Sequence, residues 1–230
     1  MEEHRQAARK SAITGMIKWW QLVLFLTMCT VIVLSFHEPP PLDVPEPFRA
    51  ASRIFYYHVP VAWVTVVAYF TGMFYGIRYL KTRDWRDDQR AHTAAQIGTV
   101  FCVLAMITGA IFAKVAWGSY WNWDPRQVSI FMLLLLYSSY FALRGSLNSD
   151  HSRGTLSAVY SILSIFAVPF FMFVMPRMSQ SLHPAQITLN PDSTRPIFFT
   201  SVACFMLLYY WMVSVSFKIN LRLCARERKF

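Results

Sequence analysis

The chain has 230 residues, of which 55% are hydrophobic and 15% are charged, and its mean hydropathy is +0.35. Apolar surface is too abundant here for a soluble domain, which shows mainly polar groups to water. Each helical crossing of a membrane takes about 20 apolar residues, so the length suits one bundle and leaves no room for a separate soluble domain. We therefore expect a single membrane domain over residues 1–230.

Continuous apolar runs predict an all-α fold, a polytopic integral membrane protein with six transmembrane helices. Because the runs do not alternate between apolar and polar residues, a membrane β-barrel is excluded. The first run follows basic residues, as in a signal peptide, but no small-x-small cleavage pattern follows it, so we interpret it as a helix. In chain order the predicted helices cover approximately residues 19–36, 59–80, 94–115, 125–143, 156–174 and 197–217.

The basic residues predict the orientation. Of the 22 Lys and Arg residues, sixteen lie at the N-terminus, in the second and fourth connections and at the C-terminus. Basic residues near helix ends stay in the cytoplasm, so both termini are predicted inside (N-in/C-in). Segments 37–57, 116–127 and 175–196 then face outward. The same asymmetry accounts for the net charge of +10 better than nucleic acid binding does.

Cysteines and nucleotide motifs exclude several functions. Cys29, Cys102 and Cys204 lie in apolar runs and Cys224 on the cytoplasmic tail, so no pair is placed to form a disulfide outside. The chain has no Cys-x-x-Cys, which excludes the usual thioredoxin-like centre and a c-type haem attachment site. It also lacks a phosphate-binding Gly-x-x-x-x-Gly-Lys-Ser/Thr loop, so any ATP hydrolysis must come from a partner.

The connection between the third and fourth predicted helices carries four aromatic rings in seven residues. One interpretation is an interfacial aromatic belt, since indole rings settle at headgroup level. However, a belt would spread its aromatics over many helix ends. The density of this loop favours flat apolar faces for a large planar ligand, with polar groups at its edge. The loop reads Trp117-Gly118-Ser119-Tyr120-Trp121-Asn122-Trp123-Asp124-Pro125-Arg126.

Two histidines are predicted on the same outer side as this tryptophan loop. His58 stands just before the second helix, where Pro60 is expected to fix the helix start, and His183 precedes Pro184 in the last outer segment. Two neutral imidazoles on opposite faces complete the six-coordination of haem iron. Each histidine alone is typical of an interfacial side chain bonded to water or a headgroup. Together with the aromatic loop, they indicate ligation.

The other histidines are weaker candidates. His37, at the outer end of the first helix, is interpreted as a cap residue, with a substitute ligand as the alternative. Three more are predicted on the cytoplasmic side and cannot share a site with His58: His4, His92 and His151.

Outer cations are available to pair with two haem propionates. Lys114 and Arg126 bracket the tryptophan loop and are the first choices, although Lys114 is equally placed to reach lipid phosphate. The outer cations considered for this role are Arg53, Lys114, Arg126, Arg177 and Arg195.

These residues resemble a known family. The loop is similar to the tryptophan-rich "WWD" signature of the haem-handling proteins of cytochrome c maturation, and segments 53–60 and 181–183 resemble the two histidine segments of that group. With six helices, the chain is similar to the small member, the haem exporter protein C (CcmC) family of system I. It departs from the pattern at Tyr120, where Trp is expected, and at Pro184. The loop residues that match are Trp117, Gly118, Trp121, Trp123, Asp124 and Arg126.

The resemblance implies a haem-binding transfer protein rather than an enzyme. It implies that His58 and His183 are axial ligands of non-covalently bound haem b (iron protoporphyrin IX) and that the tryptophan loop is the platform. From their charge and predicted side, Arg53 and Lys114 are expected as further contacts of the haem. Haem would be held at the periplasmic face of the bacterial inner membrane and passed to a CcmE-type periplasmic haem chaperone, whose own histidine bonds to a vinyl group. The implied partners, besides membrane lipid, are the subunits of an ATP-binding cassette (ABC) transporter and a small one-helix subunit.

Two other functions stay open. A b-type electron-transfer cytochrome also uses paired histidines, but its ligands usually lie inside helices at membrane depth, whereas these are predicted in outer loops. A small-molecule transporter subunit usually has ionisable residues or broken helices near the midplane. The predicted helix interiors contain almost none.

Overall fold

The computed structural model describes residues 18–37, 48–178, 180–183, 189–190 and 192–227, and no strand occurs within these ranges. Six helices are long and apolar enough to cross a membrane, which confirms the predicted all-helical membrane fold. They are Trp19–His37, Phe48–Thr82, Trp85–Trp117, Pro125–Ser146, Asp150–Met178 and Thr194–Arg222. The individual elements are α2 (Trp19–His37), α3 (Phe48–Ala51), η1 (Ser52–Ile54), α4 (Phe55–Thr82), α5 (Trp85–Trp117), α6 (Pro125–Ser146), α7 (Asp150–Ser164), α8 (Ala167–Pro169), η2 (Phe170–Val174), α9 (Met175–Met178) and α10 (Thr194–Glu227).

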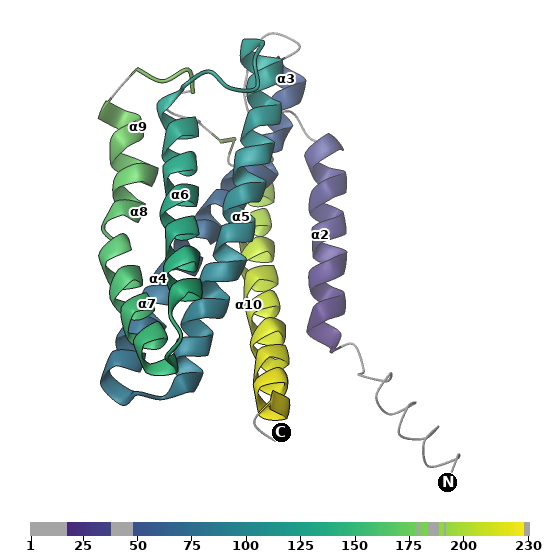
Figure 1. Ribbon diagram of the computed structural model, residues 1–230. Helices are drawn as coiled ribbons and strands as arrows, with labels where there is room; N and C mark the ends of the chain where they lie inside the picture. The colour runs from purple at the N-terminus through teal and green to yellow at the C-terminus, as the bar shows by residue number, and fades with distance from the viewer. Residues whose placement is uncertain (1–17, 38–47, 179, 184–188, 191, 228–230) are drawn as a thin grey trace.

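The long helices stand side by side, and their connections gather at two ends (Figure 1). The connections α4–α5 and α6–α7 lie at one end, together with the C-terminal end of α10. The loop from α5 to α6 and the end of α9 lie at the other end, near α3. The tryptophan loop and the start of the second membrane helix are therefore neighbours in space, as the predicted topology requires.

The second membrane helix begins earlier than predicted. α3 and η1 lead directly into α4, so His58 lies in the first turn of α4 and Pro60 lies inside the helix. The prediction that His58 precedes the helix is wrong. Proline at position 60 cannot donate to the carbonyl of Tyr56 four residues earlier. The hydroxyl of Ser201 on α10 donates to that carbonyl instead, which explains how the helix tolerates the proline.

Small residues bring the central helices close together. A Cβ atom on Gly98 of α5 would lie 2.7 Å from the Cβ of Ala68 on α4, and one on Gly154 of α7 would lie 2.5 Å from the Tyr79 ring. Such contacts let helix backbones approach closely in a membrane. The α4–α5 contact is the most extensive in the bundle, and it holds together the two helices on which one side of the site is built.

A largely buried ion pair joins α5 and α6 at the end of the bundle away from the tryptophan loop. Both terminal nitrogens of Arg144 on α6 lie 2.7 Å from the carboxylate oxygens of Asp88 on α5. The two side chains are only 7% and 14% exposed. This bidentate pair joins α5 to α6 at the end opposite the loop that connects them.

The fifth membrane helix is interrupted. Proline at positions 169 and 176 removes the donors that would bond the carbonyls of Ile165 and Met172 in a regular α-helix. The chain forms a turn at 165–166 and then a π-helical segment, η2, between the two prolines. A π-helix widens the backbone locally and often accompanies a functional site. Here the segment from η2 to α9 forms one wall of the cavity described next.

Candidate functional site

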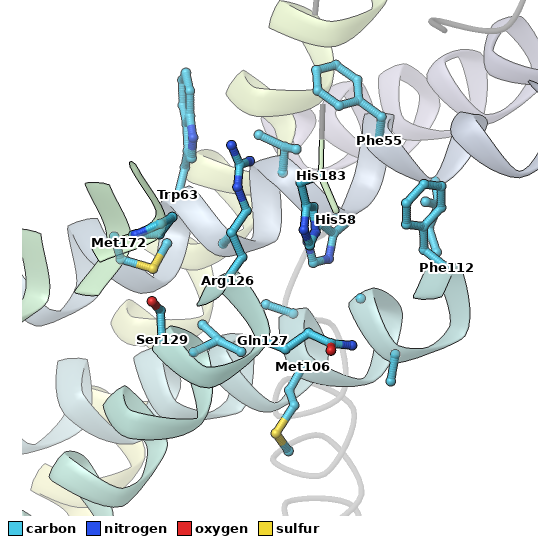
Figure 2. Close-up of a pocket in the computed structure, with 18 of the residues that line it drawn as sticks. Phe55, His58, Trp63, Met106, Phe112, Arg126, Gln127, Ser129, Met172 and His183 are labelled. Carbon is cyan, nitrogen blue, oxygen red and sulfur yellow. The ribbon is translucent and has the colours of Figure 1, made fainter. Parts of the chain in front are cut away.

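A cavity of about 360 Å³ opens at the end of the bundle that carries the tryptophan loop. This volume falls within the usual range of ligand pockets, roughly 300–1,000 Å³. Residues from α4, α5, α6, η2 and the 180–183 segment contribute to its wall. The wall is mainly apolar, and its phenylalanine and tryptophan side chains are Phe55, Trp63, Phe112, Trp121, Phe171 and Phe173. Figure 2 shows the rings of His58 and His183 at the same part of this cavity.

His58 is held against α5 by two neighbouring residues. Its Nδ1 lies 2.9 Å from the hydroxyl oxygen of Thr108, and that hydroxyl donates its own hydrogen to the carbonyl of Leu104 at 2.7 Å. The oxygen of Thr108 therefore accepts from Nδ1–H, which leaves the lone pair of Nε2 available. Gly109 provides the space for the ring, because a Cβ there would lie 3.0 Å from the Cε1 atom of His58.

His183 is held by the carboxylate of Asp124. Its Nδ1 lies 2.9 Å from Oδ1 of Asp124, whose side chain is fully buried. The rings of Trp117 and His183 make an edge-to-face contact, with ring centroids 4.7 Å apart. The same carboxylate accepts hydrogen bonds from the backbone N–H groups of Arg126 (2.9 Å) and Leu182 (2.7 Å) and from the Ser181 hydroxyl (2.8 Å). Asp124 is thus the N-cap of α6 and the anchor of the histidine segment.

These contacts set the charges at the site. Burial opposes ionisation of Asp124, but the hydrogen bonds from Arg126, Ser181 and Leu182 outweigh it and hold the pKa of Asp124 below its usual value. Burial lowers the pKa of His183, against the opposing influence of Asp124. At neutral pH the pair is therefore a carboxylate and a neutral imidazole. Asp124 accepts from Nδ1–H, and Nε2 of His183 keeps its lone pair.

The tryptophan loop is fixed by its own polar residues. Gly118 ends α5 in the left-handed region, with φ +79°. The buried side chain of Gln127 accepts from the backbone of Asn122 at 2.9 Å and donates to the carbonyl of Tyr120 at 3.0 Å. Within this loop Trp121 lines the cavity. Trp123 is 77% exposed and does not line it.

Only some of the cations predicted to pair with the propionates line the cavity. Arg126 lines the cavity, and so does Arg177 from α9. Lys114 instead donates to the carbonyl of Gly118 at 2.9 Å. Arg53 donates to the carbonyl of Ser35 on α2. Neither Lys114 nor Arg53 is among the residues that line the cavity.

Six of the predicted site residues come together. His58, His183, Trp121 and Arg126 line one cavity, and Trp117 and Asp124 contact His183. Gly118 shapes the loop without lining the cavity. The remaining three predicted site residues, Trp123, Lys114 and Arg53, lie outside the cavity wall.

The other histidines lie apart from the cavity where they are described. His37 is exposed at the end of α2. His92 lies near the start of α5 and His151 near the start of α7, at the opposite end of the bundle (Figure 1). His4 and Pro184 lie outside the described residues.

Sequence reasoning missed the residues that orient His58. Thr108 and Gly109 lie inside a long apolar run, where nothing in the sequence marks them. Arg177 was noted only as one outer cation among several. Gln127 did carry a signal, because it is a polar residue beside the tryptophan loop at the start of an apolar helix.

The ligand set suits a planar metal complex better than a bare ion. Among the described residues, no three His, Cys, Asp or Glu side chains form a cluster that holds a metal ion. Among the residues that the structure describes at the cavity, the only such side chains for a bare ion are the two imidazoles. A porphyrin brings four nitrogen ligands of its own and leaves two axial positions, which two imidazoles fill.

The fold and the site together define a multi-pass membrane protein with a mainly apolar cavity that two histidines line. The family model described as "Heme exporter protein C" matches residues 2–229, and the chain belongs to that family. This confirms the family that the tryptophan loop and the histidine segments indicate.

Relatives agree with the family assignment. The chain is 28% identical to "Heme exporter protein C" of Paracoccus denitrificans, over 99% of this chain and 98% of that protein. It is 30% identical to "Heme exporter protein C" of Rhodobacter capsulatus, over 79% of this chain and 74% of the relative. A "putative cytochrome c biosynthesis ccmC-like mitochondrial protein" of Arabidopsis thaliana is 29% identical over 65% of this chain and 55% of its own length. The family and these relatives support a role in haem handling for cytochrome c maturation.

Proposed function

We propose that the protein binds haem b non-covalently between His58 and His183 and delivers it to a CcmE-type periplasmic haem chaperone. One observation carries the proposal: two imidazoles from separate parts of the chain line the same apolar cavity. Each has its Nδ1 engaged by the protein, at 2.9 Å from Thr108 and at 2.9 Å from Asp124. Each therefore keeps Nε2 as an iron ligand.

The other residues of the cavity have separate roles in this proposal. The apolar walls, including Trp121, cover the faces of the porphyrin. Arg126 and Arg177 pair with the propionates, because guanidinium groups bind carboxylates in a planar, two-bonded geometry. Since the site supplies ligands and walls, we propose binding and transfer and not catalysis by this chain.

We further propose that the cavity lies on the periplasmic side of the bacterial inner membrane and that both termini are cytoplasmic. At the far end of the bundle, Arg83 lies in the α4–α5 connection, and Arg86 and Arg153 lie in the first turns of α5 and α7. Basic residues remain on the cytoplasmic side. In this orientation the cavity faces the compartment of the chaperone. The ABC transporter subunits and the small one-helix subunit are the proposed partners in the membrane.

The test is transfer between purified components. Haem-loaded full-length protein in liposomes is mixed with the soluble chaperone domain, and haem on the separated chaperone is measured by absorption. We expect transfer from wild type and from His92→Ala, the matched control, but not from His58→Ala/His183→Ala. Equal transfer from the double variant, or none from loaded wild type, contradicts the proposal.

One observation favours a second candidate. His58 lies in helix α4, which is where the ligands of b-type electron-transfer cytochromes usually lie. In an electron-transfer cytochrome, a quinol would reduce the bound haem reversibly. The protein would also keep its haem after the chaperone is added. Transfer with loss of haem from this chain rejects it.

A further inference from the structure

The two proposed axial ligands have unequal partners. Nδ1 of His183 bonds to the carboxylate of Asp124, whereas Nδ1 of His58 bonds to the hydroxyl of Thr108. Both contacts are 2.9 Å long, so the difference is one of charge and not of distance.

The charge of the partner affects the donor strength of the imidazole. A carboxylate that accepts from Nδ1–H makes the ring a better electron donor at Nε2, and such outer contacts typically change metal affinity about 10- to 100-fold. The Thr108 hydroxyl is neutral and its hydrogen is shared between the carbonyls of Leu104 and Ala105, at 2.7 and 3.2 Å. It therefore polarises His58 much less.

The two partners also differ in how firmly they are held. Three further donors fix the Asp124 carboxylate, from Arg126, Leu182 and Ser181. The ring of His183 is packed against Trp117 as well. Among the described residues, His58 has only neutral hydrogen-bonding partners, the Thr108 hydroxyl and a backbone hydrogen bond with Ala105, and its ring lies against the backbone at Gly109.

We propose that Asp124 and Thr108 are positioning residues that make the two ligands unequal, so that His183 is the retained ligand and His58 the exchangeable one. This inference rests on the proposed function. In the exchange the bond from iron to Nε2 of His58 breaks, and its electron pair returns to the imidazole. The incoming ligand donates its own pair to the same face of the haem, and the iron keeps its oxidation state.

Carbon monoxide is the probe for the exchangeable face. It is added to full-length protein loaded with ferrous haem, and the Fe–C and C–O stretches are recorded, because they report the donor strength of the ligand opposite. We expect Asp124→Asn to shift both stretches and Thr108→Val to leave them unchanged. The matched controls, Asp150→Asn at an exposed carboxylate and Thr71→Val at a hydroxyl bonded to its own helix, should change neither.

The opposite pattern overturns the inference: stretches that shift with Thr108→Val and not with Asp124→Asn identify His183 as the ligand that leaves. Equal shifts in both variants also reject unequal ligands. A wild type that binds no haem rejects the proposed function itself, which keeps the two failures distinct.

A second measurement covers the case in which Asp124→Asn does not fold. Haem binding is titrated for His58→Gly and His183→Gly, each with free imidazole supplied. The inference predicts that imidazole restores His58→Gly to nearly the wild-type affinity, while His183→Gly stays about tenfold weaker or worse. Equal rescue of both variants contradicts it.

Discussion

His58 occupies a space that one glycine leaves open on α5. The ring lies over Gly109, and the neighbouring Thr108 accepts the hydrogen of Nδ1. The position of this ligand is therefore set by the backbone of another helix, and a displacement of a few tenths of an ångström at Gly109 is passed directly to the imidazole.

Gly109→Ala should weaken haem binding about tenfold, because it forces the imidazole to shift by a few tenths of an ångström, which is comparable with the roughly 0.5 Å within which a ligating group must be held. The new Cβ would lie 3.0 Å from Cε1 of His58. The measurement is a haem titration followed by absorption. Gly145→Ala is the control, because a Cβ there meets nothing within 4 Å. Unchanged affinity in Gly109→Ala would mean that the ring moves freely.

The residues of the site differ in how well the sequence reveals them. His183, Trp121 and Asp124 stand in polar or aromatic clusters outside the apolar runs, where a chemical role is visible from composition. Lys114 and Arg53 have the right charge and side, yet they bond to backbone carbonyls of Gly118 and Ser35. Charge and topology predict the end of the bundle at which a residue lies, but the packing of its side chain determines whether it lines the cavity.

At the scale of the elements, α4 shows that a contact with another helix can override a local sequence signal for a helix start. Pro60 is typical of a helix start, yet the helix continues through it because Ser201 on α10 donates to the carbonyl of Tyr56. Ser201 and Tyr56 are 145 residues apart in the sequence, so the contact between them cannot be predicted from local patterns. The presence of a helix can be predicted from the length of its apolar run. The residues at which it begins and ends depend on contacts with residues that are distant in the sequence.

The α5–α6 pair depends on its buried ion pair. Arg144→Ala leaves Asp88 as a buried charge without this partner, and we expect it to lower the free energy of unfolding by about 3–5 kcal/mol. Thermal or denaturant unfolding in detergent measures the loss. The ion pair lies away from the cavity, so the haem spectrum of the folded fraction should stay unchanged.

The matched variant is Asp88→Leu/Arg144→Leu, which removes both charges together. It should recover most of the lost stability, because replacing both partners of a buried pair by apolar residues is often neutral. A double variant as unstable as Arg144→Ala alone would show that packing by the arginine, and not its charge, carries the effect.

At the scale of the whole molecule, the distribution of charge predicts how the bundle sits in the membrane. Sixteen of 22 basic residues belong to one predicted side, and the cavity lies at the other end. The fold class and the two-ended arrangement follow from the sequence, because apolar length and basic residues are local properties. The shape of the cavity cannot be predicted in this way, since its walls come from the interrupted fifth helix and from the packed helices α4 and α5.

The orientation is tested by labelling with a membrane-impermeant maleimide in a variant without its native cysteines. Gln180→Cys, at the cavity end, should react in cells whose outer membrane alone is opened. Asn148→Cys, between α6 and α7, should react only after the inner membrane is permeabilised. Both native side chains are exposed. The reverse pattern contradicts the proposed N-in/C-in topology.

The central claim is that one haem lies between His58 and His183, and the absorption spectrum of the purified protein tests it most directly. Wild type, His92→Ala and His58→Ala/His183→Ala are purified in parallel with haem supplied. The account predicts a low-spin bis-histidine spectrum for wild type and His92→Ala that is absent from the double variant. A wild type without haem, or a double variant with the same spectrum, would contradict it.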